Sequence, residues 1–432
     1  MDIDRSFSKC RARRVAAVAA WLVAGCSSNG ASSPPSAPGS ETSGASSSAL
    51  DSGPTADAST LGADVDSSLV TSDGATGASV DAGPVPDATG DAGTDGSSEA
   101  SSLAEAGPSD ASAESESNEA GPTPAPMPSA MLSETGLFKS VASDGTLNLQ
   151  DGVQEYQPMY SLWADGAEKT RWIYLPPGTQ IDTTDLDHWS FPAGTKFWKE
   201  FALGGQRLET RLLWIYGPGA DDFLLVTYWW NPEAGIANDA ELANAFGVQN
   251  VNGTTHDIPA QEDCHTCHDA LEEHVLGFGA IELNHTLPGV NIHTLIDAGS
   301  LTNDPDIADL TIPGDSTTQA ALGYLHANCG NCHNVTPGAT GIPTPAMILR
   351  LFVGATTVED TPTYQTSVNV ATTDFTGIAY RIAGQDPMDS CIPHTMLTRG
   401  GREQMPPLAT YLVDDAGVAT VNAWIMTLPQ PP

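Results

Sequence analysis

The stretch EDCHTCHDALEEH, Glu262–His274, places two cysteines and three histidines within thirteen residues. Such a cluster suits three kinds of site. A Cys-x-x-Cys pair joined by His265 or His268 is a zinc ligand set. The same pair is able to act as a redox dithiol or to close a disulfide. A histidine directly after the second cysteine also predicts covalent attachment of haem c. Spacing within this stretch does not separate the three.

A second copy of the pattern occurs further along the chain. The two copies share two cysteines and a histidine: Cys264, Cys267 and His268 in CHTCH, and Cys329, Cys332 and His333 in CGNCH. Two such pairs are able to build a four-ligand zinc site, but zinc does not require a histidine after each pair, whereas haem c does. We therefore expect two covalently attached haem c groups, held by the four cysteines, with His268 and His333 as iron ligands.

The N-terminus has the pattern of an exported protein. The basic residues Arg11, Arg13 and Arg14 precede the apolar run Val15–Ala24, which is too short to span a bilayer. Together they predict a signal peptide over residues 1–25. The sequence VAGC before Ser27 resembles the lipobox of bacterial lipoproteins. The resemblance implies acylation of Cys26 and a lipid-anchored protein at the outer membrane, facing the periplasm or the cell surface. The alternative is a plain secretory signal with an incidental cysteine.

Residues 26–130 form a segment of different composition. After the cysteine it consists mostly of Ser, Ala, Gly, Asp, Thr and Pro, with 16 acidic residues, no Lys or Arg and no aromatic residue. Such a segment buries too little apolar surface to offset the entropy lost on ordering. We expect a disordered, self-repelling linker that holds the folded part away from the membrane.

Residues 131–432 are expected to hold the folded part. They contain 36 of the 54 acidic residues and 11 of the 16 Lys and Arg, which gives a net charge of −25. A field of this sign disfavours nucleic acid as a partner and favours a basic redox partner. The alternative is that the acidity only keeps an exported protein soluble. The length predicts two domains.

Residues 131–250 are predicted to form a β-sandwich-like domain. Runs rich in aromatic and β-branched residues are separated by Gly or Pro, and Gly204–Gly205 between two such runs predicts a hairpin. Seven of the nine tryptophans lie between Trp163 and Trp230. A buried aromatic core explains them more simply than a carbohydrate-binding surface does.

Residues 251–432 are predicted to form an α-helical, cytochrome c-like dihaem region. After the second motif, GREQMPPLATYL leads into DDAGVATVNAWI, which places apolar residues on one helical face: Val418, Val421, Trp424 and Ile425. A methionine loop before a closing helix is typical of small c-type cytochromes. We predict Met405 as the sixth ligand of the second haem, with Met388 and Met396 as rivals and a plain core methionine as the alternative.

The first haem has no comparable sixth ligand in the sequence. No methionine lies between Met159 and Met347. The nearby candidates for the sixth ligand are three histidines: His274, His285 and His293. The alternatives are a methionine from a distant part of the chain and a vacant sixth position. The sequence does not choose among these options.

From Met131 onward the chain resembles a family of bacterial dihaem cytochromes with a β-rich N-terminal region. The resemblance rests on LSETGLF, LWADGAEKTRWIYLPPGTQI, WSFPAGTKFWKEF, ETRL, both Cys-x-x-Cys-His motifs and the MPP that begins at Met405. Gln404 stands where that family often has arginine. The family implies haem binding and electron transfer, without an established substrate.

These observations favour a membrane-tethered electron carrier with an α+β, multidomain organisation, and no residue is assigned a catalytic role. One alternative is a dihaem peroxidase or oxidoreductase subunit with an open first haem. Another is a β-domain binding module in which the haems act only as a relay.

Overall fold

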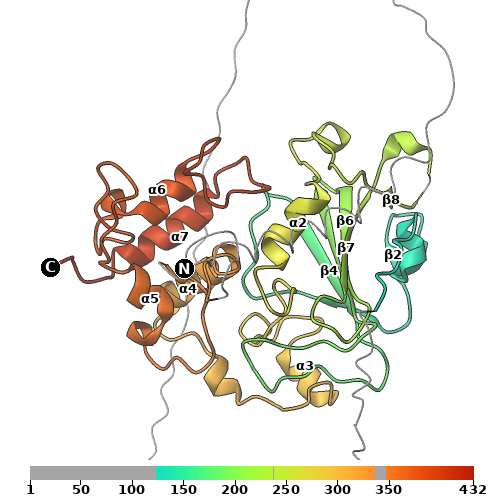
Figure 1. Ribbon diagram of the computed structural model, residues 1–432, viewed down its shortest axis with the longest axis horizontal. Helices are drawn as coiled ribbons and strands as arrows, with labels where there is room; N and C mark the ends of the chain where they lie inside the picture. Colours follow the sequence, from blue (N-terminus) through green and yellow to red (C-terminus); the bar gives the residue numbers. More distant parts are fainter. Residues whose placement is uncertain (1–122, 237, 336–346) are drawn as a thin grey trace, which may run out of the picture. The chain divides into compact units, whose positions relative to one another are not determined.

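The computed structural model describes residues 123–236, 238–335 and 347–432 (Figure 1). These residues all belong to one compact unit. Within the described ranges, no helix is both long and apolar enough to cross a membrane. The expected signal peptide, the lipid-anchor residue Cys26 and the linker up to residue 122 lie outside the described residues.

A six-stranded antiparallel sheet dominates the region between residues 132 and 250, as the sequence predicts. Its strands follow one another in chain order, each paired with the next (Figure 1). They are β3 (Val153–Tyr156), β4 (Glu168–Tyr174), β5 (Lys196–Leu203), β6 (Gln206–Ile215), β7 (Phe223–Trp229) and β8 (Glu241–Leu242).

The predicted hairpin at Gly204–Gly205 is confirmed. Both glycines connect β5 to β6 with positive φ, 55° and 79°, a conformation that costs glycine little because it has no Cβ. The pairing of these two strands shifts by one residue between Phe201 and Ala202. The register of β5 and β6 before this irregularity determines which of their side chains lie on the same face of the sheet.

The sandwich-like arrangement is present only in reduced form. The second layer is a two-stranded sheet, β1 (Phe138–Val141) with β2 (Leu147–Leu149). Its apolar residues pack against the large sheet around Trp172 and Trp198. Alternate residues of the same strands enter a second core on the opposite face, so the strands are buried on both sides. Three of the seven tryptophans in this region, Trp172, Trp189 and Trp198, are fully buried, which removes them from any surface platform.

The region after residue 250 consists of short helices joined by long loops. The α-helices of the described residues are α2 (Gln261–His268), α3 (Ile292–Asp297), α4 (Ser316–Asn328), α5 (Pro362–Ser367), α6 (Cys391–Leu397) and α7 (Asp415–Ile425). The expectation of a predominantly α-helical region is therefore met only in part. The sequence pattern overestimated helix content because turns and bends take up much of the chain between these helices.

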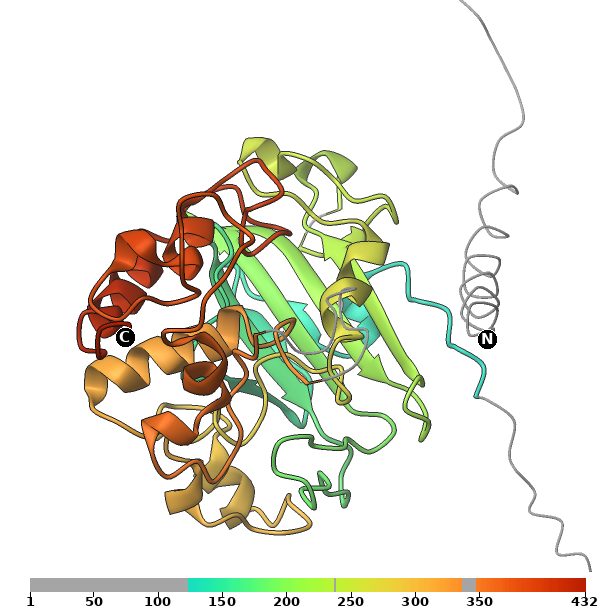
Figure 2. The same ribbon diagram turned by 60° about the vertical axis from the view of Figure 1, so that its left-hand side comes forward.

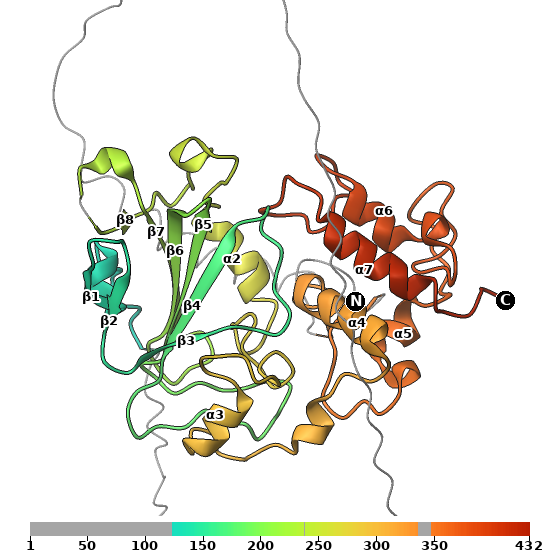
Figure 3. The same cartoon turned by 180° about the vertical axis from the view of Figure 1, so that it is seen from behind.

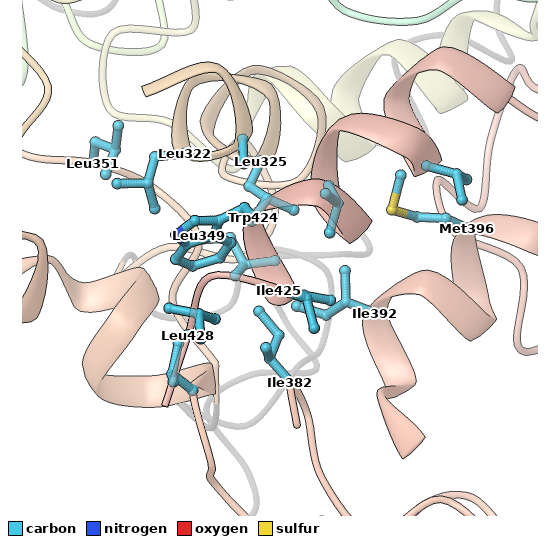
Figure 4. Packing of buried hydrophobic residues seen from close by; sticks show 14 of the residues in the cluster. Leu322, Leu325, Leu349, Leu351, Ile382, Ile392, Met396, Trp424, Ile425 and Leu428 are labelled. Atoms are coloured by element: carbon cyan, nitrogen blue, oxygen red, sulfur yellow. The ribbon is translucent and has the colours of Figure 1, made fainter. Parts of the chain in front are cut away.

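The closing helix α7 packs as its apolar pattern predicts. All four residues of its apolar face are buried: Val418, Val421, Trp424 and Ile425. Only Val418 has any exposed surface. These four residues meet leucines of α4 and residues of α6 in one core (Figure 4). The helix begins at Asp415, and the Asp414 side chain accepts a hydrogen bond from the Gly417 amide at 2.9 Å, which satisfies a free amide at the helix N-terminus.

A second core joins the sheet to the helical region. Tyr156, Phe197 and Leu225 of the sheet pack with Val275 and Phe278 from the loop after α2. The Phe278 ring lies edge-on to Tyr156, with centroids 4.9 Å apart. Helix α2 lies beside β7 (Figure 2, Figure 3). The cysteine-bearing helix is thus held against the face of the large sheet.

Candidate functional site

A cavity of about 540 Å³ lies between the large sheet, helix α2, the segment after α4 and the loop before α7. Its volume is within the range of ~300–1,000 Å³ found for small-molecule and cofactor sites. All six residues of the two motifs line it, as does Met405. The structure thus brings every haem-site residue predicted from the sequence to the wall of one cavity.

Helix α2 positions the first motif. Cys264 and Cys267 lie nearly one turn apart, and His268 is the last residue of the helix. At the start of the helix, the Asp263 carboxylate accepts a hydrogen bond from the Ala260 amide at 3.1 Å. The Gln261 side chain donates to a backbone carbonyl of β7. These bonds fix the helix so that both thiols and the imidazole face the cavity.

The hydrogen bond of His268 fixes the tautomer of its ring. Nδ1 lies 2.5 Å from the His274 carbonyl oxygen, which is able only to accept, so Nδ1 carries the proton and Nε2 has a free lone pair. Burial lowers the pKa of His268 to about 3, so the ring is neutral at physiological pH. The ring lines the cavity. A neutral imidazole whose other nitrogen bonds a backbone carbonyl is the usual state of a metal-ligating histidine.

The second motif forms a turn at the end of α4. The Cys332 and His333 amides both donate to the Cys329 carbonyl, at 3.0 and 2.8 Å. Burial lowers the pKa of His333, and the nearby Met347 carbonyl opposes that effect. His333 Nδ1 is buried without a well-formed hydrogen bond to any described residue. The imidazole is therefore neutral, and its ring is less firmly oriented than that of His268.

The two motifs meet at their second cysteines. The Cys267 and Cys332 thiols interact with each other, and this interaction is the largest factor that lowers the pKa of Cys267. The same contact raises the pKa of Cys332. Beyond the motifs, the Asn334 side chain donates to the Ala270 carbonyl at 3.0 Å. Two segments distant in sequence are thereby held together at the points where a prosthetic group would be attached.

The four motif cysteines differ in thiol acidity. Burial raises the pKa of Cys264, and it raises the pKa of Cys329 to about 12. Cys267 alone among the four has a lowered pKa, with Arg211 and Lys199 adding to the effect of the hydrogen bond. Because the thiolate is the nucleophilic form of cysteine, the interacting pair of Cys267 and Cys332 is the place in the site where a thiolate is favoured.

The methionines divide into two groups. Met405 lines the cavity, as do Met396 and Met347. Met388 is 87% exposed and is not part of the cavity wall, which argues against it as a rival to Met405. Met347 is a cavity residue that the sequence reasoning did not propose. Its backbone carbonyl lies near the His333 imidazole.

The three histidines proposed for the first iron lie outside the cavity wall. His274 donates through Nδ1 to the His268 carbonyl, and its ring stacks on Phe223 at 3.9 Å between centroids. His285 uses both ring nitrogens, with the Gln157 carbonyl at 2.6 Å and the Leu287 amide at 3.1 Å. No contact of His293 brings it to the site. Of the options that the sequence left open for the first iron, the structure therefore supports none of these three histidines.

His256 is a cavity residue that sequence reasoning missed. It is buried, lines the cavity and lies 2.7 Å from Oε1 of Glu209 through Nε2. Glu209 is fully buried and also forms an ion pair with Arg211. The loop sequence around His256 carries no motif, so only the folded contact reveals this residue.

Two basic side chains of the sheet also line the cavity, Lys199 of β5 and Arg211 of β6. The register pairs them directly. Burial, together with neighbouring guanidinium groups, lowers the pKa of Lys199 well below its ordinary value. In a strand that reads simply as aromatic and apolar, the lysine gave no sequence signal of a site.

Over the part of the chain that the structure describes, no three Cys, His, Asp or Glu side chains gather closely enough to hold a metal ion by themselves. Comparison of the chain with protein-family models, with curated proteins and with solved structures gave no match.

Proposed function

We propose that this chain is an exported electron-transfer protein with two covalently attached haem c groups. The observation that carries the proposal is the convergence of both Cys-x-x-Cys-His motifs on one cavity, with Cys267 and Cys332 in hydrogen-bond contact. Repetition of the motif in an exported chain supports haem as the ligand, and so does the resemblance to bacterial dihaem cytochromes.

The residues present suit such a group. Four thiols and two neutral imidazoles line the cavity, and the His268 tautomer leaves Nε2 free. Cys264, Cys267 and His268 would hold one haem, and Cys329, Cys332 and His333 the other, with Met405 as the sixth ligand of the second. When bound, the iron supplies one-electron chemistry.

The protein itself supplies attachment, orientation and exclusion of water. Apolar side chains such as Phe197, Leu213 and Leu225 line much of the cavity, and a low-dielectric wall influences the reduction potential of an enclosed haem. Because Cys267 and Cys332 are in contact, the two groups would be attached at neighbouring points. That proximity favours electron exchange between the two haems.

The charge of the folded part suggests the kind of partner. Residues 131–432 carry a net charge of −25, which steers basic redox proteins toward the surface and slows acidic ones. A lipid anchor at Cys26 with a long acidic linker would keep the carrier near a membrane while it reaches such partners.

Intact mass spectrometry of the full-length protein, matured in a host that attaches haem c, tests the proposal. We expect a mass that exceeds that of the processed polypeptide by two haems, and haem that stays with the chain through denaturing electrophoresis and acid-acetone extraction. Haem that can be extracted, or zinc in place of iron, would show that the motifs serve another purpose.

The enzyme alternative is favoured by one specific observation. None of His274, His285 and His293 lines the cavity, so none is placed to fill the sixth position of the first iron. A ferric spectrum separates the two functions. Two low-spin irons support a carrier, whereas a high-spin iron that binds cyanide rapidly supports a peroxidase or another oxidoreductase.

The proposed membrane anchor gives a separate prediction. If Cys26 is acylated, the wild-type protein should sediment with membranes and partition into detergent, and Cys26→Ser should be released or remain unprocessed, because a single acylated terminus is the proposed attachment. Cys391→Ser, which changes a buried cysteine of the folded part, is the control and should stay with membranes. A wild-type protein found wholly in the soluble fraction would contradict the anchor.

A further inference from the structure

A row of hydrogen-bond donors crosses the large sheet. The register aligns one residue from each of five successive strands: Tyr156, Arg171, Lys199, Arg211 and Thr227. Residues paired directly in an antiparallel sheet project to the same face. This face therefore carries three basic side chains side by side, with a hydroxyl group at each end and no carboxylate within the row.

Only one of the three basic side chains in the row forms an ion pair with a carboxylate of a described residue. Arg211 forms two hydrogen bonds with the Glu209 carboxylate, at 2.9 and 2.6 Å. Among the described residues, no carboxylate lies within ion-pair distance of Arg171 or Lys199. Like charges directly opposite one another destabilise a sheet, and burial without a carboxylate partner disfavours the charged form of Lys199. The arrangement lacks a negative charge.

Lys199 is the basic residue of the row that a negatively charged ligand would contact. It lines the large cavity together with Arg211. It also lines, with the buried Arg171, an adjoining cavity of about 20 Å³, which is roughly the space of one water molecule. That small space, whose lining also includes Glu282, cannot take a larger anion, so the carboxylate of a ligand would approach Lys199 from the large cavity.

Chance does not explain well why three basic residues lie together in this row. The folded part holds only 11 Lys and Arg against 36 acidic residues. Three of these 11 nevertheless stand consecutively in one row on the inner face of the sheet. A positive site in an acidic protein, open to a ligand cavity, has the chemistry of an anion subsite.

We propose that Lys199, with Arg211 beside it, forms a carboxylate-binding site at the floor of the cavity and receives propionate groups of a haem held there. The inference rests on the proposed function, because it takes haem as the occupant. Each haem c carries two propionates, whose negative charge must be matched inside a largely apolar wall. A free carboxylate from solution is the other source of the same chemistry.

Infrared difference spectroscopy of the holoprotein tests the contact directly. The propionate carboxyl carbons of the haem are isotopically labelled, and oxidised-minus-reduced spectra are compared for the wild type, Lys199→Met and Lys199→Arg. We expect the labelled carboxylate bands to shift in Lys199→Met and to stay close to the wild type in Lys199→Arg. Lys139→Met is the matched control, because Lys139 is exposed and pairs with Asp151.

A redox titration measures how much the substitution of Lys199 changes the reduction potential of the haem. Loss of the ammonium group should make reduction of one haem at least tenfold less favourable, a fall of about 59 mV for a one-electron couple, while Lys199→Arg should remain within threefold. Unchanged labelled bands in Lys199→Met overturn the assignment. If that variant does not accumulate, Lys199→Gln, which keeps an N–H donor and removes the charge, serves for the same comparison.

A second measurement distinguishes the two sources of carboxylate. Acetate is titrated into the ferric wild type and into Lys199→Met while the haem absorption is followed. A saturable change that the variant lacks would assign the site to a free anion and overturn the propionate assignment. The intact mass separates this inference from the proposed function. A protein with two haems and unaltered labelled bands refutes this inference alone, whereas a protein without haem refutes both.

Discussion

Replacing Cys264 and Cys267 together with alanine is expected to remove one of two covalently bound haems. The two cysteines lie on one helix that faces the cavity. Because no other motif cysteine belongs to that helix, the first haem would have no covalent attachment. Intact mass should fall by one haem, and haem absorbance per chain should fall by about half.

Two further variants make this result specific. Replacing Cys329 and Cys332 with alanine should remove the other haem, and changing all four cysteines should remove both. Cys391→Ala is the matched control, because Cys391 is buried in the core around α7 and lies outside both motifs. Its haem content should equal that of the wild type. Loss of both haems from the first double variant would mean that the two attachments depend on one another.

The remaining haem should also respond to the loss of its neighbour. The Cys267 and Cys332 thiols interact, and both motifs line the same cavity. Removing the first haem leaves space that water is able to enter, and greater exposure to solvent alters a haem potential. A second haem whose potential is identical in the double variant would indicate that the two groups do not share one enclosed space.

Local sequence pattern predicted much of the fold. The Gly204–Gly205 turn follows from the freedom of glycine at positive φ, and the apolar face of α7 follows from helical periodicity. Both signals are confined to a few neighbouring residues. The second layer of the sandwich was overestimated, because burial of both strand faces also results when a sheet packs against loops and helices.

The parts of the candidate site that come from a local motif could be predicted from the sequence. The parts that depend on the strand register could not. Each Cys-x-x-Cys-His motif is visible within five residues, but the contact between Cys267 and Cys332 joins segments far apart in sequence. The pairing of Lys199 with Arg211 depends on the strand register before the irregularity after Phe201. A slip of one residue would place the lysine on the opposite face, so composition alone did not reveal it.

Gln404 illustrates how the structure explains a departure from a family pattern. Its side chain donates to the Pro406 carbonyl at 3.2 Å and to the Thr410 carbonyl at 2.7 Å. These bonds, together with the one that Arg399 donates to the Met405 carbonyl, close the loop that carries Met405. Gln404 therefore stabilises the loop at the position where the cytochromes that this sequence resembles often have arginine.

Met405→Ala is expected to change the second haem in a way that no other methionine substitution reproduces. Met405 lines the cavity, its amide donates to the Thr395 carbonyl at 3.0 Å, and its carbonyl accepts from Arg399 at 3.2 Å. A thioether ligand raises the potential of a haem. Its loss should abolish the weak long-wavelength absorption of sulfur-ligated ferric haem and lower one midpoint potential. Because axial ligands set haem potentials over ~0.8 V, we expect a fall on the order of 0.1 V or more.

The other methionines supply the controls for that assignment. Met388→Ala should leave absorption and potentials unchanged, because Met388 is exposed and lies outside the cavity wall. Met396 is buried at the cavity edge on α6, so Met396→Leu keeps the packing volume while removing the sulfur. If Met405→Ala retains the long-wavelength band and both potentials while Met396→Leu loses them, the ligand is Met396. In that case the α6 helix, rather than the loop before α7, presents sulfur to the second iron.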